Sequence, residues 1–128
     1  MNPLFNVAKA VKKLKQIPQE NISDALLNQE IFAGLGNIIK NEVLFRTKVH
    51  PQNIVGNIPA KKLTELAKQA KEYSFDFLNW KKKFELKKHW QAYAKKKCPR
   101  CNIPLIKKYI AKTKRRTFFC SNCQVLYE

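Results

Sequence analysis

Acidic residues are scarce in this sequence of 128 residues. It has nine Asp and Glu residues and 26 Lys and Arg residues, which gives a net charge of +17. Glycine is also scarce, with three in the whole chain. No apolar run is long enough to span a membrane, and no basic segment followed by an apolar stretch opens the chain as in a secretory signal. We therefore expect a cytoplasmic protein whose thiols are reduced.

The four cysteines all fall in the last third of the chain, in two pairs with the same spacing. Cys98 and Cys101 form one pair, Cys120 and Cys123 form the other, and eighteen residues separate the pairs. Two such pairs supply the four sulfur ligands of a tetrahedral zinc site. The residues between them suit a β-hairpin, so we predict a two-stranded antiparallel zinc ribbon with one structural Zn²⁺. Two disulfides are the alternative, which the lack of a secretory segment disfavours.

The positive charge is concentrated around this ribbon. From Lys81 to Arg116 there are 15 basic residues and one acid, Glu85. Such a field favours a polyanionic partner and fast, salt-sensitive association. The alternative is a solvated lysine-rich surface without a partner. Binding to a membrane surface is less favoured, because the basic stretch contains a ribbon instead of one amphipathic helix.

Helical patterns fill the rest of the chain and predict a small helical bundle over residues 1–90, with the ribbon over 91–128. Asn2 and Pro3 suit a helix start, Asn21 suits a second, and Pro59 opens a third apolar pattern that we expect to be core up to Leu78. A series of large apolar residues follows between lysine clusters. We expect it to pack onto the domain, with stacking on bases as the alternative; its members are Trp80, Phe84, Leu86, Trp90 and Tyr93.

Two of the three glycines lie in one short segment, at Gly34 and Gly36, immediately before a helical pattern that begins near Asn37. Glycine permits a tight turn and the close approach of another molecule. A helix N-terminus offers free N–H groups and the positive end of the helix dipole, which together hold a phosphate. Taken alone, the segment is a weak motif, and a plain turn between helices is the default interpretation.

The segment belongs to a longer run that resembles the helix–two-turns–helix motif of the formamidopyrimidine-DNA glycosylase and endonuclease VIII family. The similar residues are Leu26-Leu27-Asn-Gln29, Ala33-Gly-Leu-Gly-Asn37-Ile, Glu42-Val-Leu-Phe45 and His50-Pro51. The cysteine pairs, with Arg115-Arg-Thr117-Phe-Phe-Cys120, resemble the C-terminal zinc finger of that family. The departures are Asn28, where an Asp is usual, and Ile39, where a Tyr is common.

The resemblance implies roles for individual residues. Asn37 matches an asparagine that contacts a DNA phosphate beside the lesion. Arg115 matches the arginine at the tip of the zinc-finger hairpin, which contacts the phosphates flanking the damaged nucleotide and takes part in δ-elimination. Three neighbouring residues are expected to add non-specific phosphate contacts: Lys112, Lys114 and Arg116.

The catalytic residues of the family lie in an N-terminal domain that begins with a proline nucleophile. Pro3 is not terminal, and a proline nitrogen within an amide is not nucleophilic. We therefore expect a monomeric, DNA-binding C-terminal half that binds double-stranded DNA at damaged or abasic sites, associates with the nucleoid if bacterial, and lacks lyase turnover unless a catalytic domain is supplied. The alternative is a non-catalytic zinc-ribbon protein that associates with RNA or the ribosome.

Overall fold

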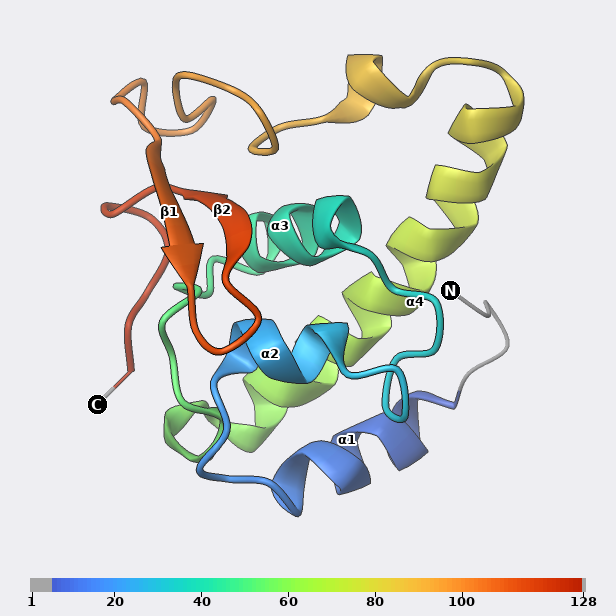
Figure 1. The fold of residues 1–128 in the computed structure, drawn as a ribbon, viewed down its shortest axis with the longest axis vertical. Helices are drawn as coiled ribbons and strands as arrows, with labels where there is room; N and C mark the ends of the chain where they lie inside the picture. The colour runs from blue at the N-terminus through green and yellow to red at the C-terminus, as the bar shows by residue number, and fades with distance from the viewer. Residues whose placement is uncertain (1–5, 128) are drawn as a thin grey trace.

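The structure is a computed structural model that describes residues 6–127. It is mainly helical and ends in a two-stranded antiparallel sheet, which confirms the expected fold class (Figure 1). The α-helices are α1 (Val7–Lys15), α2 (Ile22–Leu27), α3 (Asn37–Arg46) and α4 (Ala60–Lys82). Two short 3₁₀ turns, η1 (Val55–Asn57) and η2 (Leu86–His89), flank α4, and the strands are β1 (Ile106–Ile110) and β2 (Arg115–Phe119).

The helix starts follow local capping rules. The side-chain oxygens of Asn6 and Asn21 accept backbone N–H groups in the first turns of α1 and α2, and Pro59 directly precedes α4. The predicted starts at Asn21 and Pro59 are thus confirmed. The predicted start at Asn2 and Pro3 lies outside the described residues.

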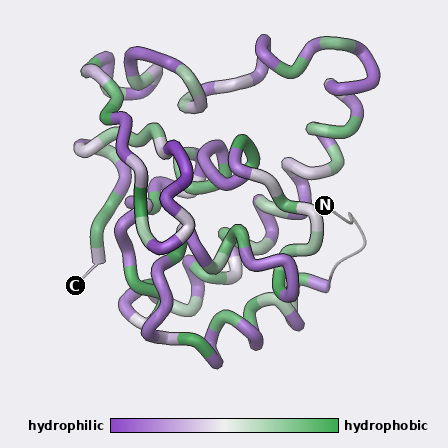
Figure 2. The backbone as a smooth tube through the Cα atoms, in the orientation of Figure 1, coloured by the Kyte–Doolittle hydropathy of each residue, from purple (hydrophilic) through white to green (hydrophobic). Residues whose placement is uncertain are grey.

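The helices share one apolar core, with α4 packed against α1 and α3. Hydrophobic and hydrophilic residues alternate along α1 and α4, as amphipathic helices require (Figure 2). The prediction that α4 is core as far as Leu78 was wrong at its end. Full burial in α4 ends at Ser74, and Phe77 is partly buried against the core. Leu78 is exposed because the last turns extend past the other helices. Within the described residues, no helix combines the length and apolarity needed to cross a membrane.

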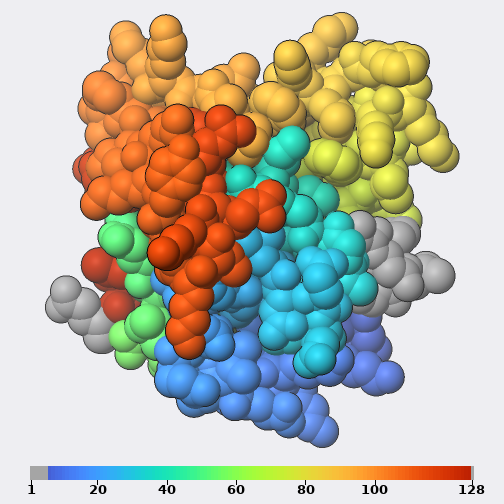
Figure 3. Space-filling model, viewed as in Figure 1, coloured from blue at the N-terminus to red at the C-terminus, as the bar shows by residue number. Residues whose placement is uncertain are grey.

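The hairpin pairs Ile106 with Phe119 and Ile110 with Arg115. Its turn has left-handed backbone at Ala111, with φ 63°, and at Lys114, with φ 49°. The hairpin lies on the near face of the molecule in Figure 3, and its turn lies beside α2 in Figure 1. A second apolar cluster joins the ribbon to α3, consisting of Phe45, Ala92, Cys98 and Cys120. The division into residues 1–90 and 91–128 remains a prediction.

Candidate nucleic-acid interface and metal centre

The four cysteine thiols converge beside the open end of the hairpin, as their spacing predicted. Their Sγ atoms all lie within 4.8 Å of one another, and the Sγ atoms of Cys98 and Cys123 are 3.7 Å apart. All four are free thiols, so the alternative of two disulfides is not what the structure contains. Asn122 Nδ2 donates a hydrogen bond to Cys101 Sγ at 3.2 Å. Four sulfur ligands in this arrangement can hold one metal ion.

Burial and the neighbouring thiols together disfavour the ionised form of Cys123. Burial raises the pKa of Cys123 to about 12, and hydrogen bonds with the other three thiols act in the same direction, whereas one with Arg100 opposes them. A bound cation reverses this effect because it stabilises the thiolate form directly. The donor set therefore fits a cation that prefers thiolates.

The glycine turn delivers the start of α3, as predicted. Gly34 has φ 80°, and its N–H donates to Gln29 Oε1 at 2.6 Å. Gln29 Nε2 donates to the carbonyl of Leu35 at 3.1 Å, so one side chain holds both sides of the turn. Gly36 precedes the helix without a side-chain cap, and a Cβ added there would meet nothing within 4 Å. The first turn of α3 therefore opens onto free space with the positive end of its dipole.

Amide side chains on α3 bind the edge of β2. Asn37 Nδ2 and Asn41 Nδ2 both donate to the carbonyl of Arg116, at 2.9 Å and 3.1 Å. Asn41 Oδ1 accepts the N–H of Phe118 at 2.7 Å. Asn37 is 8% exposed, at the point where helix and hairpin meet. Its side chain thus joins two motifs that the sequence analysis treated separately.

A buried lysine completes this junction. Lys40 is 1% exposed, and its Nζ donates to Thr117 Oγ1 at 2.7 Å. Burial lowers the pKa of Lys40 to about 8; the nearby positive charge of Arg115 lowers it further, and Asp24 acts in the opposite direction. Thr117 Oγ1 in turn donates to the carbonyl of Arg115 at 3.0 Å. The lysine therefore supports the strand that begins with Arg115.

The tip of the hairpin is fastened to α2 by a carboxylate. Asp24 accepts the backbone N–H groups of Lys112 and Thr113, at 3.1 Å and 3.2 Å. At the other side of β2, Arg116 Nη2 donates to Tyr93 Oη at 3.2 Å. The tip is thus held through its backbone, which leaves the side chains of Lys112 and Lys114 exposed.

A second carboxylate fastens the segment between α4 and the ribbon to α3. Glu42 is 0% exposed. Its Oε1 accepts the N–H of Gln91 at 2.7 Å, and its Oε2 accepts those of Ala92 and Tyr93 at 2.8 Å each. Three backbone donors therefore satisfy a buried charge and fix the position of Tyr93.

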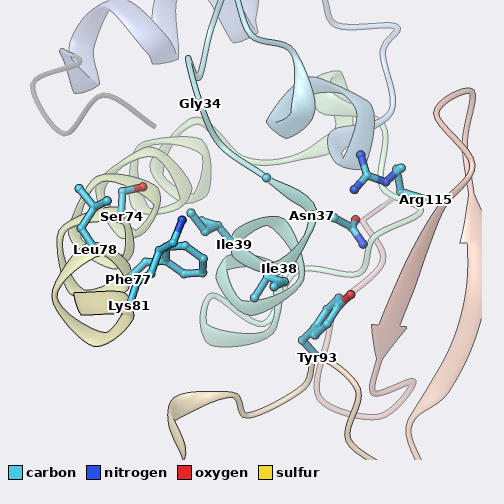
Figure 4. Close-up of a pocket in the computed structure, with 11 residues that line it drawn as sticks. Gly34, Asn37, Ile38, Ile39, Ser74, Phe77, Leu78, Lys81, Tyr93 and Arg115 are labelled. Carbon is cyan, nitrogen blue, oxygen red and sulfur yellow. The ribbon is translucent and has the colours of Figure 1, made fainter. Parts of the chain in front are cut away.

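These contacts surround an open groove of about 390 Å³. The start of α3, the later turns of α4 and the hairpin each contribute to it (Figure 4). The predicted residues Gly34, Gly36, Asn37 and Arg115 all line this groove. The remaining predicted residues lie outside its lining: Lys112 and Lys114 line a separate hollow beside Asp24, and Arg116 is exposed on β2.

Apart from Asn37, sequence reasoning missed the polar residues that assemble the site. Asn37, Lys40 and Asn41 have the i, i+3, i+4 spacing of one helix face, which was the available signal. Asp24 and Glu42 gave no comparable signal, because their partners are backbone groups far away in the sequence. Lys81, from α4, also lines the groove and was not expected there.

The comparisons with known proteins agree with this architecture. Residues 1–74 match the model of the formamidopyrimidine-DNA glycosylase H2TH domain. Human Endonuclease 8-like 3 is 30% identical over 124 residues, covering 96% of this chain and 20% of the relative. Formamidopyrimidine-DNA glycosylase of Lactobacillus helveticus is 36% identical over 124 residues, covering 86% of this chain and 44% of the relative.

Solved structures show the same fold. The Lactococcus lactis formamidopyrimidine-DNA glycosylase, bound non-covalently to DNA containing an AP site, superposes with a TM-score of 0.85 at 28% identity and covers 97% of this chain and 47% of that one. A viral DNA glycosylase superposes with a TM-score of 0.81 at 29% identity, over 93% of this chain and 45% of that one.

Fold and site together define a helix–two-turns–helix protein with a four-cysteine ribbon. The match over more than half of its length shows that the chain belongs to the formamidopyrimidine-DNA glycosylase and endonuclease VIII family. It spans between a fifth and a half of the length of these relatives.

Proposed function

We propose that this chain is the DNA-binding part of a base-excision-repair glycosylase and holds duplex DNA at a damaged or abasic site. The observation that carries the proposal is the shared groove, where the open start of α3 at Asn37 and the guanidinium of Arg115 lie on one surface. Similar solved structures are described as complexes with abasic-site and damaged DNA, which supports the choice of ligand.

The groove offers two kinds of phosphate donor. The first turn of α3 supplies backbone N–H groups, and the amide of Asn37 has a second hydrogen beyond the one given to Arg116. Arg115 supplies a planar cation that can bind a phosphate in bidentate fashion. The open space at Gly36 lets the DNA backbone come close to the helix. Lys112, Lys114 and Arg116 widen the phosphate footprint without reading sequence.

Zn²⁺ is the metal that we assign to the four cysteines, in a structural role. The ion would hold the end of β2 at Cys120, five residues after Arg115 in the sequence. Its contribution to DNA binding is therefore indirect, through the position of the hairpin.

Base removal and strand cleavage are expected to need a catalytic domain of the family type, and we assign no nucleophile within these residues. Arg115 is the one residue here to which we assign a part in the lyase step, at δ-elimination. We expect a monomer in the cytoplasm, or on the nucleoid if the source is bacterial.

The test is a gel-shift titration with an end-labelled duplex containing one abasic site, an intact duplex of the same sequence, and a structured RNA. We expect preference for the abasic duplex. Arg115→Ala and Asn37→Ala should each weaken its binding by about 1 to 3 kcal/mol, the scale of a charge-assisted or buried hydrogen bond. Lys68→Ala, which removes an exposed charge from α4 away from the groove, is the control.

Equal affinity for abasic and intact duplex would contradict lesion-site binding. Tight RNA binding that excess abasic duplex does not compete away would favour the alternative, an RNA-associated protein.

A further inference from the structure

Phe84, at the end of α4, is exposed although the sequence predicted that it packs onto the domain. Its side chain is 95% exposed. Other aromatic residues of the same segment have partners: Trp80 stacks on His89 with ring centroids 3.9 Å apart, and Trp90 meets Tyr93 edge to face at 5.0 Å. Among the four aromatic residues of the series, the expectation was therefore wrong for Phe84 alone.

The backbone at Phe84 is one that glycine normally adopts. Its φ is 58°, its N–H donates to the carbonyl of Lys81 at 3.2 Å, and the N–H of Glu85 donates to the carbonyl of Trp80 at 2.8 Å. This pair of bonds closes a helix in the Schellman motif, in which the left-handed residue is usually Gly. A bulky side chain there is disfavoured. Phe84 gains no burial in return, so the fold alone gives no reason for an aromatic ring.

The ring of Phe84 has both an apolar neighbour and several lysines around it. Phe84 and Leu86 line an open hollow of about 590 Å³, together with Glu85 and three lysines, Lys81, Lys87 and Lys88. The acid in this segment, Glu85, has its carboxylate 3.8 Å from His89 Nε2. An exposed aromatic face within a lysine cluster is the arrangement with which proteins bind unpaired nucleic acid, because bases stack on the ring while cations contact the phosphates.

The hollow adjoins the groove described above at one shared residue. Lys81 lines both of them and points from α4 into the groove in Figure 4. In Figure 3 the end of α4 and the ribbon rise as two lobes with a hollow between them. A DNA strand bound at Asn37 and Arg115 therefore has a cationic path to Phe84.

We propose that Phe84 and its lysines form a subsite for unpaired DNA that continues beyond the bound duplex, with one base stacked on the Phe84 ring. The subsite extends the proposed function and rests on it, because a DNA strand must first be bound at Asn37 and Arg115 in order to continue toward Phe84. Unpaired DNA is required because a base within a duplex has both faces covered by its neighbours.

The test compares Phe84→Gly and Phe84→Trp with the unchanged protein. Glycine removes the ring and suits the left-handed backbone, so this variant should melt no lower than the parent. Tryptophan keeps a stacking face. Phe75→Ala is the matched control, since Phe75 is another exposed aromatic of α4 and lines neither the groove nor the hollow. The ligands are a fluorescein-labelled oligothymidylate and the blunt abasic duplex, followed by anisotropy at several salt concentrations.

We expect Phe84→Gly to weaken oligothymidylate binding on the order of tenfold, the effect of losing one stacked base. Phe84→Trp and Phe75→Ala should bind it as the parent does, and all variants should bind the blunt duplex equally. The salt slope for oligothymidylate should stay unchanged, because no charge is removed. An effect below twofold, or equal losses for both ligands, would overturn the subsite. Failure of the proposed function would be seen separately, as an Arg115→Ala variant that binds the abasic duplex normally.

Discussion

Replacing Lys40 with Met tests whether the junction between α3 and the hairpin contains a buried charge. Lys40 is 1% exposed, donates to Thr117 Oγ1, and lies near the positive charge of Arg115. Methionine has a similar length and no charge. The hydroxyl of Thr117 keeps its bond to the carbonyl of Arg115, so the substitution leaves no buried donor unpaired.

The expected pH dependence follows from the pKa of Lys40, which is about 8 in the folded chain against 10.5 for an ordinary lysine. Below pH 8 the lysine is charged in both states, and the folded state bears the full cost of burying the charge. Between pH 8 and 10.5 the unfolded state holds more protons, so the stability of the parent rises with pH. In total, the titration of Lys40 raises the free energy of unfolding by about 3 kcal/mol from low to high pH. About 2 kcal/mol of this rise falls between pH 7 and pH 10.

The measurement is the free energy of unfolding in urea at several pH values between 7 and 10, for parent and variant loaded with zinc. The stability of the parent relative to Lys40→Met should rise by about 2 kcal/mol across this range. Lys68→Met, at an exposed position, controls for the titration of ordinary lysines. A gap between parent and Lys40→Met that stays constant with pH would refute a buried, charged Lys40.

Three further predictions concern the contacts that hold the site together. Glu42→Gln should destabilise the chain to urea by about 2 to 4 kcal/mol, because three backbone N–H groups lose a buried charged acceptor; unchanged stability would contradict this contact. Asp24→Ala should lower the free energy of unfolding by about 1 kcal/mol and loosen the hairpin tip, because the backbone N–H groups of Lys112 and Thr113 lose their acceptor. Faster amide hydrogen exchange at these two residues would reveal the loosening. Metal chelation should weaken DNA binding while most far-ultraviolet helical signal remains; unchanged DNA affinity would place the ribbon outside the footprint.

Features that depend on local rules could be predicted from the sequence. The cysteine spacing located the cluster of four thiols, Asn21 and Pro59 located helix starts, and the glycines at 34 and 36 located the turn before α3. Each of these depends on a few neighbouring residues whose conformational preferences are strong. The family resemblance gave Asn37 and Arg115 separate phosphate contacts, and their meeting in one groove is a finding of the structure.

Features that depend on which surfaces meet could not be predicted. Lys40 and Glu42 are among the least exposed residues of α3, although charged residues are rarely buried without partners. Their partners are supplied by the hairpin and by the segment after α4, which no local pattern identifies. The prediction that Phe84 packs onto the domain was wrong for the opposite reason, because α4 extends past the elements that would have covered this residue.

The junction between helix and hairpin also bears on the order of folding. Its hydrogen bonds link residues 77 to 79 positions apart for Lys40 and Asn37, and 89 apart between Asp24 and Thr113. Contacts of such separation form late, because a large part of the chain must lose its freedom first. The helices and the ribbon each have local contacts that can form earlier. We therefore expect the groove lined by Asn37 and Arg115 to appear only in the last step of folding, when two parts that are already structured dock.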